Sequence, residues 1–201
     1  MKVLILGGFL GSGKTTALLS LARFLVANSS SERENKVAIL ENEVGEIGID
    51  DKVLATSGFA VSNLFAGCAC CTVSGEFTDA ARKIRDELDP EWLVIETTGI
   101  AYPESMRENL AAALSLASRL IVIADAKRWT RLFAAMNSLI SGQIVGAEVV
   151  LINKCDLADD ETLAKIEEDI RGMEPRTKIF RVSAKAGIAD KIWREAAGMG
   201  D

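Results

Sequence analysis

The chain has no histidine and only four cysteines among its 201 residues. Without imidazole, a metal site would have to use thiolates, carboxylates, water or ligands from a partner. Four cysteines also fall short of the disulfide framework that small secreted domains carry. We therefore expect a cytoplasmic protein with reduced thiols, in which clustered cysteines favour metal or redox chemistry.

The chain also has no excess of positive charge and no long apolar segment. Its 23 basic and 29 acidic residues give a net charge of −6, which argues against nucleic acid as the main partner. No apolar stretch reaches the roughly 18 residues of a membrane span. We read the opening run "MKVLILGGFL" as a buried strand, not as a signal peptide, because a glycine-rich turn soon interrupts it. No membrane partner is expected.

Short apolar runs alternate with helix-like segments along the whole chain. Strands are expected at 2–8, 36–42, 60–67, 91–99, 119–125, 147–154 and 178–184, and helices at 14–27, 76–88, 104–117, 128–138, 161–172 and 188–197. Runs such as 120–124 and 149–152 are apolar throughout, which is typical of strands buried on both faces. The pattern predicts a doubly wound α/β fold, with a mainly parallel sheet and helices on both faces, in one domain over 1–201.

The stretch "GGFLGSGKTT" follows the first predicted strand and opens the first helix. It matches the phosphate-loop pattern G-x-x-x-x-G-K-[ST] at Gly8, Gly13, Lys14 and Thr15. Glycines let backbone N–H groups turn toward phosphates, and the helix N-terminus adds partial positive charge. Lys14 would reach the β and γ phosphates, and Thr15 would bind Mg²⁺. The alternative is a glycine-rich turn with a stray lysine.

Two stretches after later strands indicate a guanine base. "LINKCDL" places an N-K-x-D pattern at Asn153, Lys154 and Asp156. The Asp156 carboxylate can accept hydrogen bonds from the ring N–H and the amino group of guanine, which adenine does not offer together. "SAK" at Ser183 to Lys185 fits a second base-contacting loop, although Ser183 could instead cap a helix.

A third motif is "WLVIETTG", an apolar strand that ends in a carboxylate. Glu96 at the strand tip can hold the Mg²⁺ shell through water. Gly99 can bring its N–H to the γ-phosphate and act as a switch hinge. The alternative is that Glu96 is only a solvated strand end.

The motifs together resemble the CobW/HypB/UreG group of P-loop GTPases, most closely its CobW-type metal chaperone branch. The matching pieces are "GGFLGSGKTT", "ENEVGEIGID", "GCACCTVSGEF", "ETTGIAYP", "INKCDL" and "SAK", in that order. The resemblance implies a GTP-hydrolysing switch that delivers a transition metal to, or assists, a metalloenzyme or a cobalamin-related protein. CobW-type proteins commonly carry a smaller C-terminal domain, and we expect none in this chain.

The resemblance also implies roles for particular residues. Phosphates and Mg²⁺ would be bound by Gly8, Gly11, Ser12, Gly13, Lys14, Thr15 and Thr16, and guanine by Asn153, Lys154, Asp156, Ser183, Ala184 and Lys185. The catalytic candidates are Lys14, Glu43, Glu96 and Gly99. The first switch segment would be 41–50, with Glu41 and Glu43 near metal or nucleotide.

In the stretch "GCACC" the resemblance makes Cys68, Cys70 and Cys71 a metal-binding triplet. Three thiolates suit Zn²⁺, or another transition metal such as Co²⁺ or Ni²⁺, and leave an open position that favours transfer. Glu41 or Glu43 is our candidate for the fourth ligand, which would let nucleotide state change metal affinity. Buried packing and thiol oxidation are the alternatives.

Two other functions remain open at this stage. The chain could be a metal-free GTPase that gates a cofactor-dependent enzyme, such as a corrinoid enzyme. It could also be a small-molecule kinase, although a kinase has no use for "NKCD". No residue is identified as a general base, so we expect slow hydrolysis that a homodimer partner or a client metalloprotein accelerates.

Overall fold

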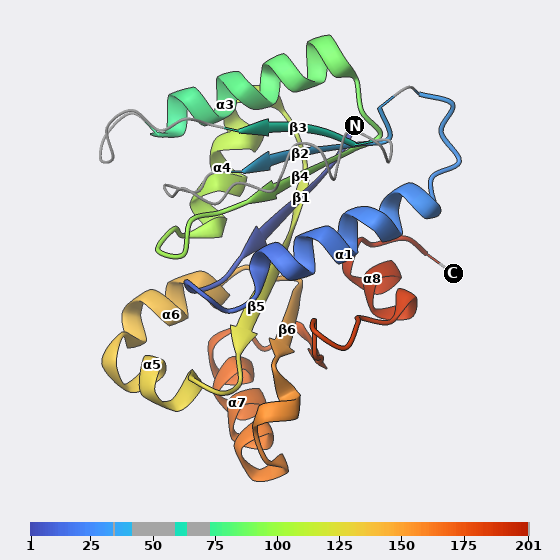
Figure 1. Cartoon of the computed structure of the whole chain (residues 1–201). Coiled ribbons are helices and arrows are strands. Elements are labelled where there is room, and N and C mark those ends of the chain that lie inside the picture. Colours follow the sequence, from blue (N-terminus) through green and yellow to red (C-terminus); the bar gives the residue numbers. More distant parts are fainter. Residues whose placement is uncertain (34, 42–58, 64–72, 201) are drawn as a thin grey trace.

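The computed structural model describes residues 1–33, 35–41, 59–63 and 73–200. In these ranges seven strands form one sheet in the order β3-β2-β4-β1-β5-β6-β7, and every neighbouring pair is parallel (Figure 1). The strands are β1 (Lys2–Gly7), β2 (Val37–Glu41), β3 (Phe59–Asn63), β4 (Trp92–Glu96), β5 (Ser118–Asp125), β6 (Val149–Asn153) and β7 (Lys178–Arg181). The predicted doubly wound parallel sheet is confirmed.

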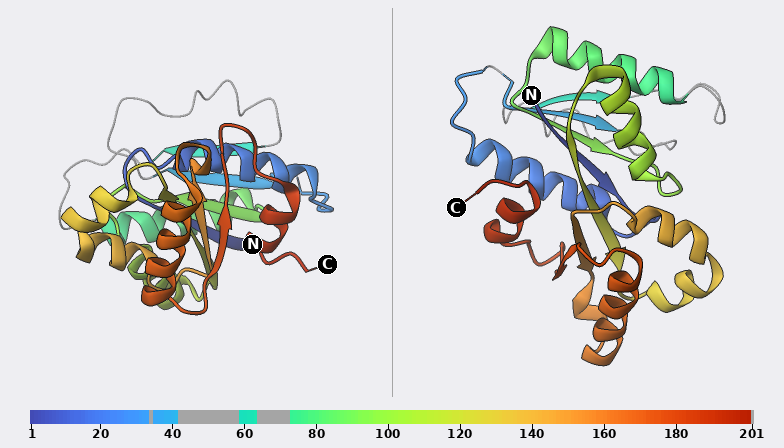
Figure 2. Two further views of the ribbon diagram at one scale, coloured as in Figure 1. Left: turned by 90° about the horizontal axis from the view of Figure 1, so that it is seen from below. Right: turned by 180° about the vertical axis from the view of Figure 1, so that it is seen from behind.

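Helices cover both faces of this sheet (Figure 2). They are α1 (Lys14–Ala27), α3 (Val73–Lys83) with a following π-helical turn (Ile84–Leu88), α4 (Pro103–Leu114), α5 (Trp129–Ala135), α6 (Asn137–Ile144), α7 (Asp160–Met173) and α8 (Asp190–Ala196). Buried residues of α1 and α8 pack on one face, and those of α3, α4, α6 and α7 pack on the other.

The apolar strands supply both cores because successive side chains point to opposite faces. In β1, Leu4 and Leu6 pack with α1, whereas Val3 and Ile5 pack with the helices on the opposite face. All four side chains are buried. A strand that serves two cores needs an unbroken apolar run, which is the pattern that the sequence shows.

Local signals set several helix boundaries. Pro103 occupies the first turn of α4, where a missing N–H costs no hydrogen bond. The side chain of Asp159 caps α7 by accepting a hydrogen bond from the Thr162 amide at 2.8 Å, and this contact lowers the pKa of Asp159. The π-helical turn after α3 ends at Asp89, which has a positive φ of 37° and precedes Pro90.

The predicted helix over 128–138 is wrong in its extent. The chain bends at Met136 and forms α5 before it and α6 after it. Trp129 and Phe133 stack on each other in α5, with ring centroids 5.6 Å apart, while Ile140 of α6 is buried in the core. Each short helix therefore buries its own apolar side, which one straight helix could not do.

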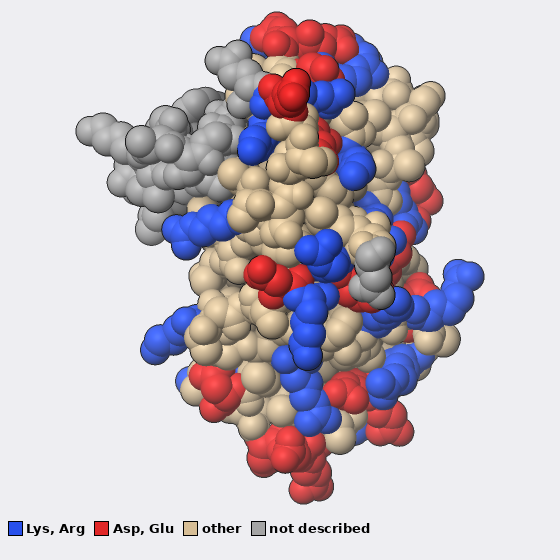
Figure 3. All heavy atoms as spheres, turned by 90° about the vertical axis from the view of Figure 1, so that its right-hand side faces the viewer, with Lys and Arg blue, Asp and Glu red and all other residues tan. Residues whose placement is uncertain are grey.

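The surface mixes charges of both signs. On the face shown in Figure 3, basic and acidic side chains are interspersed. Within the described ranges, no helix is both long enough and apolar enough to cross a membrane.

The first prediction tests the core. Ile95 in β4 is fully buried, so Ile95→Ala should lower the free energy of unfolding by about 2–5 kcal/mol, measured by urea denaturation. Ile100→Ala is the matched control, because Ile100 is 70% exposed and should change stability by less than about 0.5 kcal/mol. Equal losses in the two variants would contradict this assignment of the core.

Candidate nucleotide-binding site

The predicted motifs come together at the carboxyl edge of the sheet. The phosphate loop follows β1, Glu96 ends β4, Asp125 ends β5 and Asn153 ends β6. The strand order runs outward from β1 in both directions, and parallel sheets bind ligands where the order reverses. Motifs that lie far apart in the sequence therefore meet at one edge of the sheet.

The glycines of the phosphate loop are required by its backbone. Gly8, Gly11 and Gly13 have positive φ values of 138°, 71° and 100°. A Cβ atom at Gly8 would overlap the carbonyl oxygen of Ile123, and one at Gly13 would overlap the side-chain amide of Asn153. The loop thus lies directly against the tips of β5 and β6.

The loop also has features that fit a phosphate. Ser12 is fully buried, and its hydroxyl has no hydrogen-bond partner among the described residues, so it offers a donor to a ligand. Lys14 is buried in the first turn of α1. The N-terminus of that helix adds partial positive charge at the same place.

Three successive carbonyl groups of the loop accept hydrogen bonds from side chains at the tips of β5 and β6. The pairs are Arg128 Nη2 to Leu10 O at 2.6 Å, Lys154 Nζ to Gly11 O at 2.7 Å, and Asn153 Nδ2 to Ser12 O at 2.8 Å. In a trans peptide the C=O and the following N–H point in opposite directions. Holding the carbonyls of Leu10 and Ser12 on the outside therefore turns the N–H groups of Gly11 and Gly13 toward the inside of the loop, where an anion would sit, whereas the Ser12 N–H donates to the Phe9 carbonyl oxygen at 3.1 Å.

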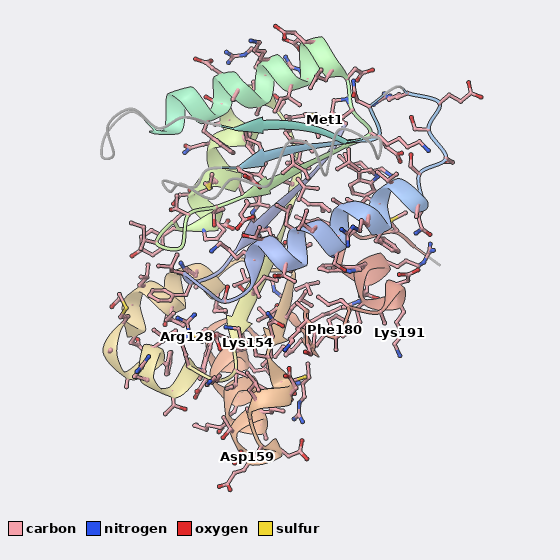
Figure 4. All side chains as sticks on the ribbon, viewed as in Figure 1. Met1, Arg128, Lys154, Asp159, Phe180 and Lys191 are labelled. Atoms are coloured by element: carbon pink, nitrogen blue, oxygen red, sulfur yellow. The ribbon has the colours of Figure 1, made fainter. Side chains whose placement is uncertain are left out.

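Asp125 links two of these donors. Its carboxylate is buried and accepts hydrogen bonds from Arg128 Nε at 2.6 Å and from Lys154 Nζ at 2.8 Å. Burial alone would raise the pKa of Asp125, but the hydrogen bonds and charges of Lys154 and Arg128 outweigh it, so the pKa lies below its ordinary value. Figure 4 shows Arg128 and Lys154 near one another. Lys154 also has a left-handed backbone, with φ of 61°, a strained conformation often found at functional sites.

Asn153 joins the two predicted base-binding segments to the phosphate loop. Besides donating to Ser12 O, it accepts a hydrogen bond from the Ala184 amide at 2.8 Å through Oδ1. Asp156 lies in the short turn after Asn153 and is exposed. The alternative that Ser183 caps a helix is wrong, because α8 begins only at Asp190.

A cavity of about 580 Å³ lies next to these segments. Three predicted nucleotide contacts line it, namely Thr16 from α1 and Ala184 and Lys185 from the loop after β7. A second cavity, of about 670 Å³, lies elsewhere, is lined by residues such as Arg119 and Lys178, and contains none of the predicted nucleotide residues. The candidate nucleotide site is the phosphate loop with the loops after β6 and β7, where the motifs converge. The smaller cavity adjoins it at Thr16, Ala184 and Lys185 and extends along α1 to Asn28.

One carboxylate contacts the phosphate-loop threonine, and a second lies next to that carboxylate in the sheet. Thr15 Oγ1 donates a hydrogen bond to Glu96 Oε1 at 3.1 Å. Glu96 is only 2% exposed, so the alternative of a solvated strand end is wrong. Glu41 ends β2 directly opposite Glu96 in the strand register and is also buried. Hydroxyl and carboxylate oxygens are ligands that Mg²⁺ prefers, so this corner fits the ion.

The loop after β4 touches the phosphate loop. A Cβ atom at Gly99 would lie 2.6 Å from the backbone nitrogen of Leu10, so only glycine allows this approach. Buried Gln143 of α6 donates to the carbonyl oxygens of Gly99 at 2.9 Å and Ala101 at 3.3 Å. The loop that contains Gly99, the predicted γ-phosphate hinge, is therefore bound by a side chain of α6.

Sequence reasoning missed Asp125 and Gln143, and it gave Arg128 no role although it placed Arg128 near the edge of the active site. Asp125 offered a usable signal, because it ends an apolar strand at the edge where the other motifs meet. The roles of Arg128 and Gln143 depend on contacts with backbone carbonyl oxygens far away in the chain. Such contacts leave no pattern in the sequence.

Several predicted residues lie outside the described ranges: Glu43 and the cysteines Cys68, Cys70 and Cys71. Among the described residues, no group of three or more acidic or cysteine side chains is arranged to hold a metal ion. Cys155, in the "NKCD" stretch, is described and is not in a disulfide.

Known proteins with similar sequences include metal chaperones. The chain is 29% identical to the zinc chaperone CobW of Pseudomonas aeruginosa, over 87% of this chain and 54% of that protein. It is 30% identical to the zinc chaperone YjiA of Escherichia coli, over 91% and 58%. It is 32% identical to the zinc-regulated GTPase metalloprotein activator 1 of Schizosaccharomyces pombe, over 91% and 46%. The chain thus spans about half the length of these relatives.

Solved structures show the same fold. The zinc-bound YjiA GTPase of Escherichia coli matches with a TM-score of 0.68 at 23% identity, covering 100% of this chain and 63% of that one. The hydrogenase maturation factor HypB of Archaeoglobus fulgidus matches with a TM-score of 0.67 at 19% identity, covering 96% and 86%. The family profile of the CobW/HypB/UreG nucleotide-binding domain matches residues 2–181. This chain therefore belongs to the CobW/HypB/UreG family of nucleotide-binding domains.

Proposed function

We propose that this domain binds GTP and GDP together with Mg²⁺, and hydrolyses GTP to GDP and phosphate. The observation that carries the proposal is the position of Asn153, which is hydrogen-bonded both to the phosphate loop at Ser12 and to the second base loop at Ala184. One side chain thereby sets the separation between a phosphate site and a base site. That arrangement suits a nucleotide with both ends bound.

The residues around the loop have different proposed roles in GTP hydrolysis. The loop amides, Ser12 and Lys14 bind the phosphates, and Thr15 and Glu96 hold the Mg²⁺ shell. The ion would supply positive charge to the oxygens that become more negative during hydrolysis. Gly99 stays our candidate for the γ-phosphate contact, and Glu43 remains a catalytic candidate from the sequence. We identify no general base, so the proposed hydrolysis is slow without a partner.

We further propose that the protein binds a transition metal through Cys68, Cys70 and Cys71 and delivers it to a client metalloprotein or cobalamin-related protein in the cytoplasm. The names of its relatives, zinc chaperones and a zinc-regulated activator, support Zn²⁺ over Co²⁺ or Ni²⁺. Glu41 lies beside Glu96 at the proposed Mg²⁺ corner, so a cysteine site that used Glu41 would be coupled to the nucleotide. A homodimer is a further partner that we propose to test.

The second prediction tests base recognition. In Asp156→Asn, the side-chain amide can donate a hydrogen bond where the carboxylate could only accept one. Affinity for GDP should therefore fall at least tenfold, and affinity for XDP, which carries a carbonyl in place of the guanine amino group, should rise. Isothermal titration calorimetry with GDP and XDP measures this change in nucleotide preference.

Asp160→Asn is the matched control for this change. Asp160 is an exposed residue at the start of α7, and its variant should keep the nucleotide preference of the wild type. If Asp156→Asn kept full affinity for GDP, the assignment of the base site would be wrong. Tighter binding of ADP than GDP by the wild type would favour the kinase alternative.

The third prediction tests the metal. Reduced protein titrated anaerobically with Zn²⁺ against a chromogenic chelator should bind about one ion, and a Cys68→Ser, Cys70→Ser, Cys71→Ser variant should lose this binding. Affinity should rise with pH, because metal binding displaces protons from the thiols. It should also differ between the GDP state and a non-hydrolysable GTP state.

Cys155→Ser provides the control, since it removes a thiol of the same chain outside the triplet. It should bind Zn²⁺ as the wild type does. Binding that survives in the triple variant, or no binding in any nucleotide state, would contradict metal delivery. The protein would then fit the alternative of a metal-free GTPase that gates a cofactor-dependent enzyme.

A further inference from the structure

We propose that Arg128 and Asp125 form a positioning pair that holds the phosphate loop in its anion-binding shape. Neither residue belongs to the phosphate-loop, "NKCD" or "SAK" motifs. The inference rests on the proposed nucleotide binding and adds to it a requirement for two residues at the junction of β5 and α5. Four observations support it.

The first observation is the forked geometry of Arg128. Its Nε donates to Asp125 Oδ2 and its Nη2 donates to Leu10 O, both at 2.6 Å. A guanidinium group is planar, so these two bonds fix its orientation. Leu10 therefore accepts a hydrogen bond whose donor cannot turn away without breaking the ion pair.

The second observation is that Asp125 binds both the side chain and the backbone amide of Arg128. The backbone amide of Arg128 donates to Asp125 Oδ1 at 3.3 Å and to the Asp125 carbonyl oxygen at 3.2 Å. The Asp125 side chain is fully buried, while that of Arg128 is 29% exposed. A buried carboxylate thus anchors a partly exposed arginine that reaches over the loop.

The third observation is the place of contact. Leu10 is 60% exposed and lies in the loop, where Asn153 and Lys154 hold only the two following carbonyl groups. The next residue, Gly11, has a positive φ and can adopt other backbone conformations at little cost. If the peptide between Leu10 and Gly11 turned over, its carbonyl oxygen would face the phosphate in place of an N–H.

The fourth observation is the close packing of the guanidinium on the loop. A Cβ atom at Gly11 would lie 3.2 Å from Arg128 Nη2. Arg128 therefore covers the outer side of the loop as well as binding it. A lysine at this position would bring one charged nitrogen and could not make the same two bonds in one plane.

These contacts predict that removing Arg128 lowers nucleotide affinity by an amount that depends on the number of phosphates in the nucleotide. The loop amides bind the β-phosphate of GDP and GTP, which GMP lacks. Removing Arg128 should therefore weaken GDP and GTP about tenfold, the order expected for one charge-assisted hydrogen bond, and should leave GMP nearly unchanged.

The experiment measures the ratio of GDP to GMP affinity by calorimetry, in Mg²⁺, for the wild type, Arg128→Gln, Arg128→Lys and Asp125→Asn. Arg131→Gln is the matched control, since Arg131 is an exposed arginine of α5, the helix that begins directly after Arg128. We expect the ratio to fall about tenfold in Arg128→Gln, to be restored only in part in Arg128→Lys, and to stay unchanged in Arg131→Gln. The double variant of Asp125 and Arg128 should lose less than the sum of the single losses.

Each outcome supports or overturns the pair. A wild type that does not bind GDP would overturn the proposed function itself. A wild type that binds GDP, with an unchanged ratio in Arg128→Gln, would overturn the pair alone. Equal losses of GDP and GMP would show a general structural role and would also overturn it. If circular dichroism shows that Arg128→Gln does not fold, the ratio of GDP to GMP affinity in Arg128→Lys decides whether the pair is supported.

Discussion

The buried carboxylate of Asp125 is the contact on which the arrangement of the site depends. It holds Lys154 and Arg128, which in turn hold two carbonyl groups of the phosphate loop. A buried charge is stable only when it is paired, so the cost of separating these groups keeps them together. The phosphate loop owes its shape to side chains from β5 and β6 as much as to its own glycines.

The parallel sheet makes this arrangement possible. Because all its strands run in the same direction, the loops that follow β1, β4, β5 and β6 meet at one edge. The same register places Glu41 opposite Glu96, and Glu96 accepts a hydrogen bond from Thr15. Two corners thus form around the phosphate loop, one suited to Mg²⁺ and one suited to the base.

The segment from β5 to α6 contacts two loops of the candidate site. Arg128 is bonded to the phosphate loop, and Gln143 is bonded to the loop that contains Gly99. These two loops already touch at Leu10 and Gly99. A displacement of Gly99 would therefore be transmitted to α6 through a buried hydrogen bond, which gives the proposed switch a physical path to the surface.

The sequence alone determined the parallel α/β fold, because unbroken apolar strands must be covered on both faces. It also identified the phosphate loop and the "NKCD" motif, because their chemistry depends on the local order of residues. It misjudged the helix at 128–138, because the bend at Met136 depends on how the apolar sides of α5 and α6 both pack into the same core. Only the tertiary structure decided that Asp125, Arg128 and Gln143 belong to the site. Asp125 carried one signal, its place at the end of an apolar strand. The partners of Arg128 and Gln143 include backbone carbonyl groups brought close by folding, and every residue type carries the same carbonyl, so no pattern in the chain could reveal those contacts.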